Sequence, residues 1–99
     1  MKNFDERVWE MIKKIPKGKV TSYKIIARRL GTRAYRAVGN ACNRNPFAPE
    51  VPCHRVVNHS GNIGGYAHSL KRKIFLLEKE GIQVEGKKIK NFNKVLFRF

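Results

Sequence analysis

The sequence predicts a mainly α fold, with a compact three-helix core, a fourth helix and at most a short β-hairpin. Apolar residues recur at helical spacing in four segments of the chain. Residues that cap and end helices lie at the bounds of those segments. With 99 residues and a hydrophobic content of 41%, the chain can bury one modest core. We therefore expect a single domain over residues 1–99.

The first helix is predicted by the segment "NFDERVWEMIKKI". Asn3 can cap it, and Asp5 and Glu6 suit the positive end of the helix dipole. Its apolar stripe comprises Phe4, Val8, Met11, Ile12 and Ile15. The following "PKGK" breaks the pattern and ends the helix.

Two shorter helices are predicted by "TSYKIIARRLG" and "TRAYRAVGNACN". Thr21 or Ser22 can cap the first of them, Gly31 can end it, and Thr32 can cap the second. Two short helices around a glycine-containing turn are typical of a helix-turn-helix. We place this motif at about residues 21–44, in a winged-helix-like core.

The third helix has an apolar and a polar face. Helical spacing puts Tyr35, Val38, Ala41 and Cys42 on the apolar face, so Cys42 is interpreted as a core residue. The polar face carries Arg36, Gly39, Asn40 and Asn43. A glycine inside a helix costs about 1 kcal/mol relative to alanine. Gly39 either lets another backbone approach closely or is a tolerated surface glycine.

The second half of the chain holds more turns. After the proline-rich loop "NRNPFAPEVP", "CHRVV" predicts a short extended segment, and "NHSGNIGGY" is rich in turn residues. "SLKRKIFLLEKEG" predicts the last helix, capped by Ser69 and ended by Gly81. "QVEGKKI" predicts a small hairpin, and the tail "NFNKVLFRF" is expected to pack back on the domain.

The charge of the chain points to a polyanionic partner. It has 22 Lys and Arg residues against 7 Asp and Glu, a net charge of +15. Such an excess opposes compaction, so we expect nucleic acid as the partner, a solvated basic surface being the alternative. No stretch reaches the roughly 20 apolar residues of a membrane span, and no signal-peptide pattern begins the chain. We expect a cytoplasmic protein without membrane contact, with Cys42 and Cys53 as reduced thiols.

Cys53, in "VPCHRVVN", can be a core residue, a metal ligand or a nucleophile. The zinc-ligand spacing C-x₂₋₄-C does not occur, so we expect no metal. A nucleophile needs a base and a group that orients the base, and His54 and Arg55 beside the thiol favour this interpretation. Glu78 or Glu80, at a helix end where negative charge is unfavourable, can orient the histidine. Spacing alone leaves the inert and the reactive cysteine both open.

The stretches "NPFAPEVPCHRVV", "GNIGGY" and "LLEKEG" resemble the C-terminal domain of the O6-alkylguanine-DNA alkyltransferases, the methylated-DNA–protein-cysteine methyltransferases. "KVTSYKIIARRLG" and "YRAVGNACNRNP" are similar to the helix-turn-helix of that family. The resemblance runs from about Phe4 to Gly81. It implies DNA repair by transfer of the alkyl group of O6-alkylguanine to Cys53 after base flipping, in a single turnover. It implies no cofactor, and a monomer that binds double-stranded DNA.

The resemblance assigns a role to each site residue, with the active-site loop and cysteine motif at about 45–67. Cys53 takes the alkyl group, His54 accepts the thiol proton through a water, and Glu80 orients His54. Asn45 organises the active-site turn, and Tyr23 lies near the guanine and its flanking phosphate. Arg36 enters the base stack, with Gly39 and Asn40 also against the DNA. The pocket for the alkylated base is implied at Val56, Gly64, Gly65 and Tyr66.

The resemblance implies a different DNA groove from the one that the bare motif predicts, and the chain itself departs from the family pattern. A bare helix-turn-helix would predict major-groove binding, whereas the family uses the minor groove. The family's N-terminal domain has no counterpart here, so the chain is either a minimal form or a fragment. Gly65 and Ala67 replace an asparagine and a serine of many members, which leaves the accepted alkyl groups open. The rival functions are an alkyltransferase-like sensor, which typically has tryptophan in place of the cysteine, and a transcription regulator.

Overall fold

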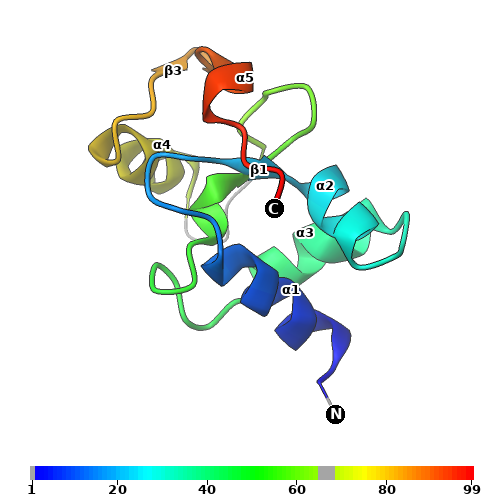
Figure 1. Ribbon diagram of the computed structural model, residues 1–99. Coiled ribbons are helices and arrows are strands. Elements are labelled where there is room, and N and C mark those ends of the chain that lie inside the picture. The colour runs from blue at the N-terminus through cyan, green and yellow to red at the C-terminus, as the bar shows by residue number, and fades with distance from the viewer. Residues whose placement is uncertain (1, 65–68) are drawn as a thin grey trace.

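A computed structural model of the chain describes residues 2–64 and 69–99, and the predicted mainly α fold is confirmed (Figure 1). The elements, in chain order, are α1 (Phe4–Lys13), β1 (Thr21–Ser22), α2 (Tyr23–Arg29), α3 (Tyr35–Asn43), the 3₁₀ turn η1 (Cys53–Arg55), β2 (Val56–Val57), α4 (Leu70–Lys79), β3 (Val84–Glu85), β4 (Lys88–Ile89) and α5 (Phe92–Val95). Among the described residues, no helix has the length and apolar character needed to cross a membrane.

Helix α1 forms as the sequence predicts. The Asn3 side chain accepts from the Glu6 N–H at 2.9 Å, and the Glu6 carboxylate accepts from the Asn3 N–H, which completes a capping box. Val8 and Ile12 are fully buried. This stripe packs against α3 and fixes the position of the helix-turn-helix.

Helices α2 and α3 form the predicted helix-turn-helix, but α3 begins differently from the prediction. Ser22 caps α2, and Gly31, at φ +76°, ends it. The N-cap of α3 is Ala34, which gives no side-chain cap; Thr32 instead accepts from the Ala34 N–H in the turn, so its predicted capping role is wrong.

The predicted burial of Tyr35 is also wrong, because this side chain is 50% exposed. Side chains in a helix tilt toward its N-terminus. Since Tyr35 is the first residue of α3, its ring projects past the end of the helix, where the core does not cover it. Val38, Ala41 and Cys42 alone form the buried face.

A two-stranded parallel sheet, which the sequence does not predict, joins the helix-turn-helix to the cysteine segment. Strand β1 pairs with β2 in the register Thr21↔Val56 and Ser22↔Val57. The predicted extended segment "CHRVV" is therefore extended only at its last two residues, since Cys53–Arg55 turn as a 3₁₀ helix. This turn directly precedes β2, which pairs with β1.

The C-terminal part agrees with the prediction except in its last helix. Ser69 caps α4, Gly81 follows it at φ +87°, and β3 and β4 form the predicted hairpin. A further helix, α5, follows α4, so the prediction that α4 is the last helix is wrong. The four residues of α5 are too few to show helical periodicity in the sequence. The tail packs back as expected, because the Phe97 N–H donates to the Val20 carbonyl and Leu96 bridges to Val20.

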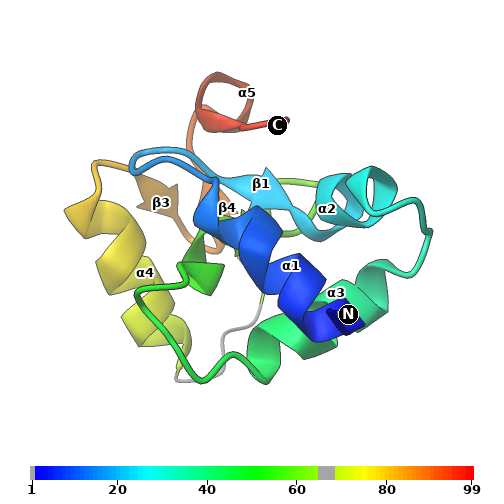
Figure 2. The ribbon, with the colours of Figure 1, turned by 60° about the horizontal axis from the view of Figure 1, so that its bottom comes forward.

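In the described part of the chain, the core consists of two apolar clusters. One cluster gathers residues of α1, α2, α3, η1 and β2, and the other gathers residues of α4 and the C-terminal hairpin with Val20, Val57 and Ile63. In both ribbon views α4 lies on one side and α2 and α3 on the other (Figures 1 and 2). The cysteine segment thus sits where the two halves of the molecule meet.

Candidate active site and nucleic-acid interface

Cys53 begins the η1 turn and is almost fully buried. Its exposed fraction is 3%, and it belongs to the same apolar cluster as Cys42 and Val51. Its N–H donates to the Val51 carbonyl at 2.8 Å, which closes the turn that leads into η1. The thiol therefore lies inside the protein although it follows a polar loop.

His54 and Glu80 are brought together from η1 and the C-cap of α4. The distance from His54 Nε2 to Glu80 Oε2 is 3.0 Å, and His54 is 2% exposed. A carboxylate can only accept hydrogen bonds, so Nε2 carries the hydrogen of this bond. In a neutral imidazole this makes Nδ1 the nitrogen that can accept a proton.

The environment sets the charge states of this pair. Burial alone would raise the pKa of the Glu80 carboxyl, but hydrogen bonds from Arg55 and His54 outweigh it and hold that pKa below its ordinary value. Burial lowers the pKa of His54, and this outweighs the hydrogen bond and charge of Glu80 that act the other way. At neutral pH the site thus holds an ionised glutamate and an uncharged histidine.

Arg55 is a structural partner in this site that the sequence revealed only as a nearby positive charge. Its Nε donates to Glu80 Oε1 at 2.9 Å and its Nη2 to Oε2 at 2.6 Å, a two-pronged contact. Its Nη1 donates to the Ile15 carbonyl at 2.8 Å. Arg55 therefore fixes the carboxylate that contacts His54 and ties it to the end of α1.

Asn45 holds the turn that precedes the cysteine. It is 6% exposed; its Nδ2 donates to the Val51 carbonyl at 2.8 Å, and its Oδ1 accepts from the Phe47 N–H at 2.9 Å. Both bonds lie within the loop between α3 and η1, and the bond to Val51 reaches its far end. The role of Asn45 in organising the active-site turn stays a prediction.

Lys73 is a buried cation near the cysteine that the sequence analysis missed. It is 0% exposed on α4, and its Nζ donates to the Val56 carbonyl at 2.8 Å and lies 5.9 Å from the centre of the Tyr23 ring. Burial lowers the pKa of Lys73 to about 8, against the opposing charges of Cys42 and Cys53. The sequence does contain a signal for the burial of Lys73, because helical spacing puts it on one face with Leu70 and Leu77.

The two cysteines lie in the same cluster but have different expected roles. Burial raises the pKa of the Cys42 thiol to about 12, and its exposed fraction is 5%. The prediction that Cys42 is a core residue is confirmed.

Burial also raises the pKa of the Tyr23 hydroxyl above its ordinary value, which keeps this hydroxyl protonated.

The residues expected to contact DNA lie on the outer side of α3. Arg36 and Asn40 are exposed, and Gly39 between them is half-buried. A Cβ added at Gly39 would lie 4.0 Å from the Tyr23 ring, which is ordinary contact. Packing inside the protein therefore does not require a glycine at this position.

Two of the residues expected to line the alkyl pocket, Val56 and Gly64, lie in the described part of the chain. Val56 is fully buried, and Gly64 adopts φ +68°, a conformation that favours glycine. Gly65 and Tyr66, with the neighbouring Ala67, lie outside the described residues. Among residues 2–64 and 69–99, no three Cys, His, Asp or Glu side chains gather as metal ligands.

Comparisons with known proteins match this arrangement. A family model described as "6-O-methylguanine DNA methyltransferase, DNA binding domain" matches residues 3–82. The methylated-DNA–protein-cysteine methyltransferase of Methanosarcina acetivorans is 49% identical over 79 residues, which are 79% of this chain and 51% of that protein. The crystal structure of Mycobacterium tuberculosis OGT in complex with DNA has a TM-score of 0.77 at 46% identity, over 81% of this chain and 50% of that one.

A third relative matches along its whole length. S. pombe Atl1, in a crystal structure with damaged DNA containing O6-carboxymethylguanine, has a TM-score of 0.84 at 31% identity, over 98% of both chains. In contrast, the chain spans about half the length of the curated relatives it matches. The matched segment contains both the helix-turn-helix and the cysteine turn. The chain therefore belongs to the 6-O-methylguanine DNA methyltransferase family, of which it carries the DNA-binding domain.

Proposed function

We propose that this protein repairs alkylated DNA by moving the alkyl group of O6-alkylguanine onto Cys53, once per molecule. The observation that carries the proposal is the hydrogen bond between His54, in the turn that begins with Cys53, and Glu80, which Arg55 also contacts. A neutral histidine, an ionised glutamate that orients it, and a thiol are the parts of an activated nucleophile. Methyltransferase names among the relatives support the same reaction.

The proposed reaction begins with proton transfer to His54. Its Nδ1 accepts the Cys53 proton through a water, while Glu80 holds the Nε2 hydrogen and stabilises the imidazolium that forms. The thiolate attacks the alkyl carbon, an S–C bond forms, and the C–O6 bond breaks. Guanine leaves with the electron pair, and the Tyr23 hydroxyl donates a hydrogen bond toward it. The thioether that results is not readily hydrolysed, so the protein is spent after one turnover.

The burial of Cys53 supports base flipping. A thiol that is 3% exposed is out of reach of a base that remains stacked in a duplex. The damaged nucleotide must therefore leave the stack and enter the protein, at a cost of a few kcal/mol. Arg36, exposed on α3, is proposed to fill the vacated place, and Gly39 to allow the backbone of the minor groove to come close.

One observation favours a second function, binding of alkylated DNA without transfer. The match to Atl1 spans 98% of both chains, whereas the methyltransferase matches span about half of those proteins. A protein of this kind needs the DNA surface and the alkyl pocket but no nucleophile. The presence of Cys53 beside His54 and Glu80 supports transfer instead.

The test is the intact mass of the protein after incubation with a duplex that contains O6-methylguanine, with an unmodified duplex as control. We expect the gain of one methyl group, mapped by peptide digestion to Cys53. Cys53→Ala should gain no methyl group and should still bind the duplex, whereas Cys42→Ala, the matched control in the same cluster, should react. Tight binding without any mass gain in the wild-type protein would establish the second function.

A further inference from the structure

Tyr35 stands between two hollows on the surface of the helix-turn-helix. Its side chain is 50% exposed although it is the first residue of α3. Both hollows are lined by Tyr35 and Lys24. The first, of about 300 Å³, is completed by Tyr23, Asn58, His59 and Ser60. The second, of about 370 Å³, is completed by Ala27, Arg28, Thr32 and Arg33. We call the second hollow the Tyr35 pocket.

The lining of the Tyr35 pocket suits an anion. It has three exposed cations, Lys24, Arg28 and Arg33, and no acidic residue. None of the three forms an ion pair with a carboxylate in the described part of the chain, where Arg44 and Arg55 do form such pairs. Like charges that repel each other without a counter-charge cost stability, and a bound phosphate removes that cost.

The aromatic ring gives the pocket a second chemical feature. An exposed ring beside cations is the combination that holds a nucleic-acid strand, since phosphates meet the cations and sugars or bases pack on the ring. The Thr32 hydroxyl already accepts from the Ala34 N–H at 3.1 Å and can donate its own proton to a phosphate oxygen.

The position of the pocket indicates which part of the DNA it meets. Tyr35 directly precedes Arg36 in α3, and the first hollow contains Tyr23, the residue proposed to lie beside the damaged guanine. A single strand that passes from Tyr23 over the Tyr35 ring therefore reaches the Tyr35 pocket at a flanking nucleotide.

We propose that the Tyr35 pocket is a second DNA-binding site, which takes a backbone phosphate and its deoxyribose on one side of the flipped nucleotide. The inference rests on the proposed function, in that duplex DNA is the partner. It adds Tyr35, Lys24, Arg28 and Arg33 to the interface. These residues hold the duplex in place while Arg36 enters the stack; they do not touch the reacting atoms.

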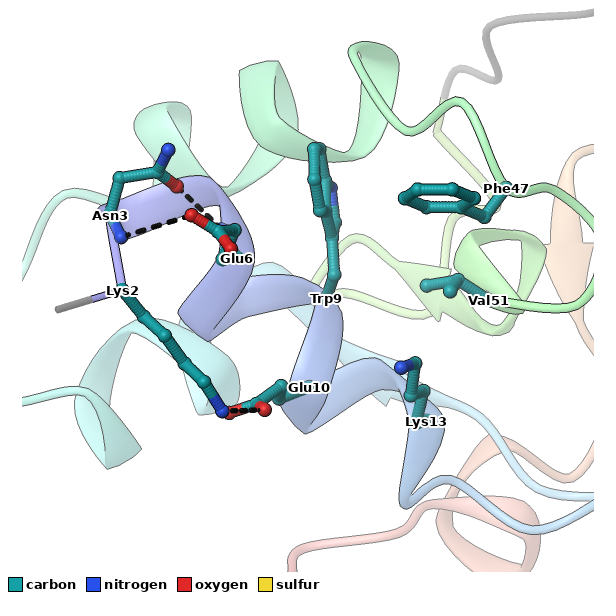
Figure 3. Close-up of a pocket in the computed structure, with 8 residues that line it drawn as sticks. All are labelled: Lys2, Asn3, Glu6, Trp9, Glu10, Lys13, Phe47 and Val51. Carbon is teal, nitrogen blue, oxygen red and sulfur yellow. Dashed lines mark hydrogen bonds and ion pairs between the residues drawn. The ribbon is translucent and has the colours of Figure 1, made fainter.

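The salt dependence of duplex binding tests the cations. Removal of one cation that binds a phosphate should reduce the slope of log affinity against log salt by about 0.9. We expect this for Arg28→Gln and for Arg33→Gln, measured by fluorescence anisotropy with an unmodified duplex, so that no alkyl transfer is needed. Lys13→Gln is the matched control, since Lys13 is an exposed cation on α1 (Figure 3). An unchanged slope for both arginine variants, or an equal change for Lys13→Gln, would overturn the proposal.

The ring is tested separately. Tyr35→Ala should weaken duplex binding and slow duplex repair about fivefold to tenfold, as the removal of one aromatic ring that packs on a nucleotide does. Tyr35→Phe should retain both, and Tyr35→Ala should react normally with free O6-benzylguanine. Phe75→Ala, which removes a similarly exposed ring from α4, serves as control. Loss of the free-base reaction would indicate damage to the site and count against a role confined to DNA binding. Unchanged duplex affinity in Tyr35→Ala would refute the role of the ring.

Discussion

At the scale of single residues, Glu80 connects the chemistry of the site to its structure. One carboxylate accepts from His54 on one side and from two nitrogens of Arg55 on the other. Because Arg55 also donates to the Ile15 carbonyl, the orientation of the imidazole depends on where α1 ends. A shift of α1 would therefore reach His54 through two side chains.

Glu80→Gln should slow transfer from duplex O6-methylguanine by about a hundredfold in a single-turnover assay, since a general base contributes at least about that much and His54 acts as the base only while Glu80 positions it. The amide cannot stabilise the imidazolium by charge. Glu78→Gln is the matched control, because Glu78 is an exposed acid two residues earlier on the same helix. The prediction fails if both variants react at the wild-type rate, or if Glu78→Gln is slowed as much.

The pH profile of the same variant separates a positioning role from a merely structural one. His54 must be neutral to accept a proton, and its pKa lies below the ordinary 6.5, so wild-type transfer should fall only when the pH drops below that value. Glu80 raises the pKa of His54, so its removal should move the fall to still lower pH. A shift toward higher pH would contradict the assigned arrangement.

At the scale of elements, α3 combines in nine residues a packed face and the face proposed to contact DNA. Gly39 is half-buried and a Cβ there meets nothing closer than the Tyr23 ring at 4.0 Å. An alanine would therefore fit inside the protein. What it changes is the outer surface of the helix, between Arg36 and Asn40.

Gly39→Ala should therefore raise the free energy of unfolding by up to about 1 kcal/mol, measured by thermal denaturation, because alanine is the better helix former. The same change should weaken duplex binding, since the added methyl group separates α3 from the minor-groove backbone. Reaction with free O6-benzylguanine should be unaffected and serves as the control. A more stable protein with unchanged duplex affinity would mean that Gly39 is only a tolerated surface glycine.

The elements also show where sequence reasoning works. Caps and stops act locally, so Asn3, Ser22, Ser69, Gly31 and Gly81 mark the helices correctly. The pairing of β1 with β2 joins residues that are far apart in the chain, and two-residue strands are too short for alternation to show. Tyr35 fits the apolar spacing, but spacing does not reveal that the helix starts at that residue.

Only some of the residues of the candidate site could be predicted from the sequence. The neighbouring Cys53 and His54 stand out in the sequence, and the unfavourable helix-end position of an acid pointed to Glu78 or Glu80, of which the family resemblance selected Glu80. The contacts of Arg55 and Lys73 could not be inferred, since they depend on how the end of α4 meets η1 and how its middle meets β2, although helical spacing did indicate the buried position of Lys73. The roles proposed for Gly65 and Tyr66 stay predictions.

At the scale of the whole molecule, charge is distributed unevenly over the fold. Asp5, Glu6 and Glu10, three of the 7 acidic residues, lie on α1. That helix packs on the side of α3 that bears Val38 and Ala41, away from Arg36 and Asn40. Figure 3 shows Glu6 and Glu10 around a hollow with Trp9 and Phe47, a surface of mixed charge. In the pocket on the helix-turn-helix, by contrast, Lys24, Arg28 and Arg33 have no acidic neighbours, which suits the proposed contact with DNA phosphates.

The C-terminal tail stabilises this arrangement from outside the segment matched by the family model, which ends at residue 82. The Val20 N–H donates to the Val95 carbonyl at 2.9 Å, and the Val20 carbonyl accepts from the Phe97 N–H at 2.6 Å. Val20 is fully buried and directly precedes β1. The Phe97 ring packs against the cluster that contains Cys53 and the buried faces of α1, α2 and α3. The tail thus holds the strand that joins the helix-turn-helix to the cysteine turn.

Phe97→Ala should lower the free energy of unfolding by about 1–3 kcal/mol, because it removes a partly buried ring but leaves both backbone bonds of Val20 in place. In a domain of this size, each kcal/mol should lower the melting temperature by about 4–8 °C. Phe75→Ala is the control, since a ring that is 56% exposed on α4 should contribute less than about 0.5 kcal/mol. At temperatures where Phe97→Ala is folded, its reaction with free O6-benzylguanine should match the wild-type rate, because the hydrogen bonds between His54, Glu80 and Arg55 do not involve the ring. Equal melting temperatures for the two variants would show that the tail rests on the domain without stabilising it.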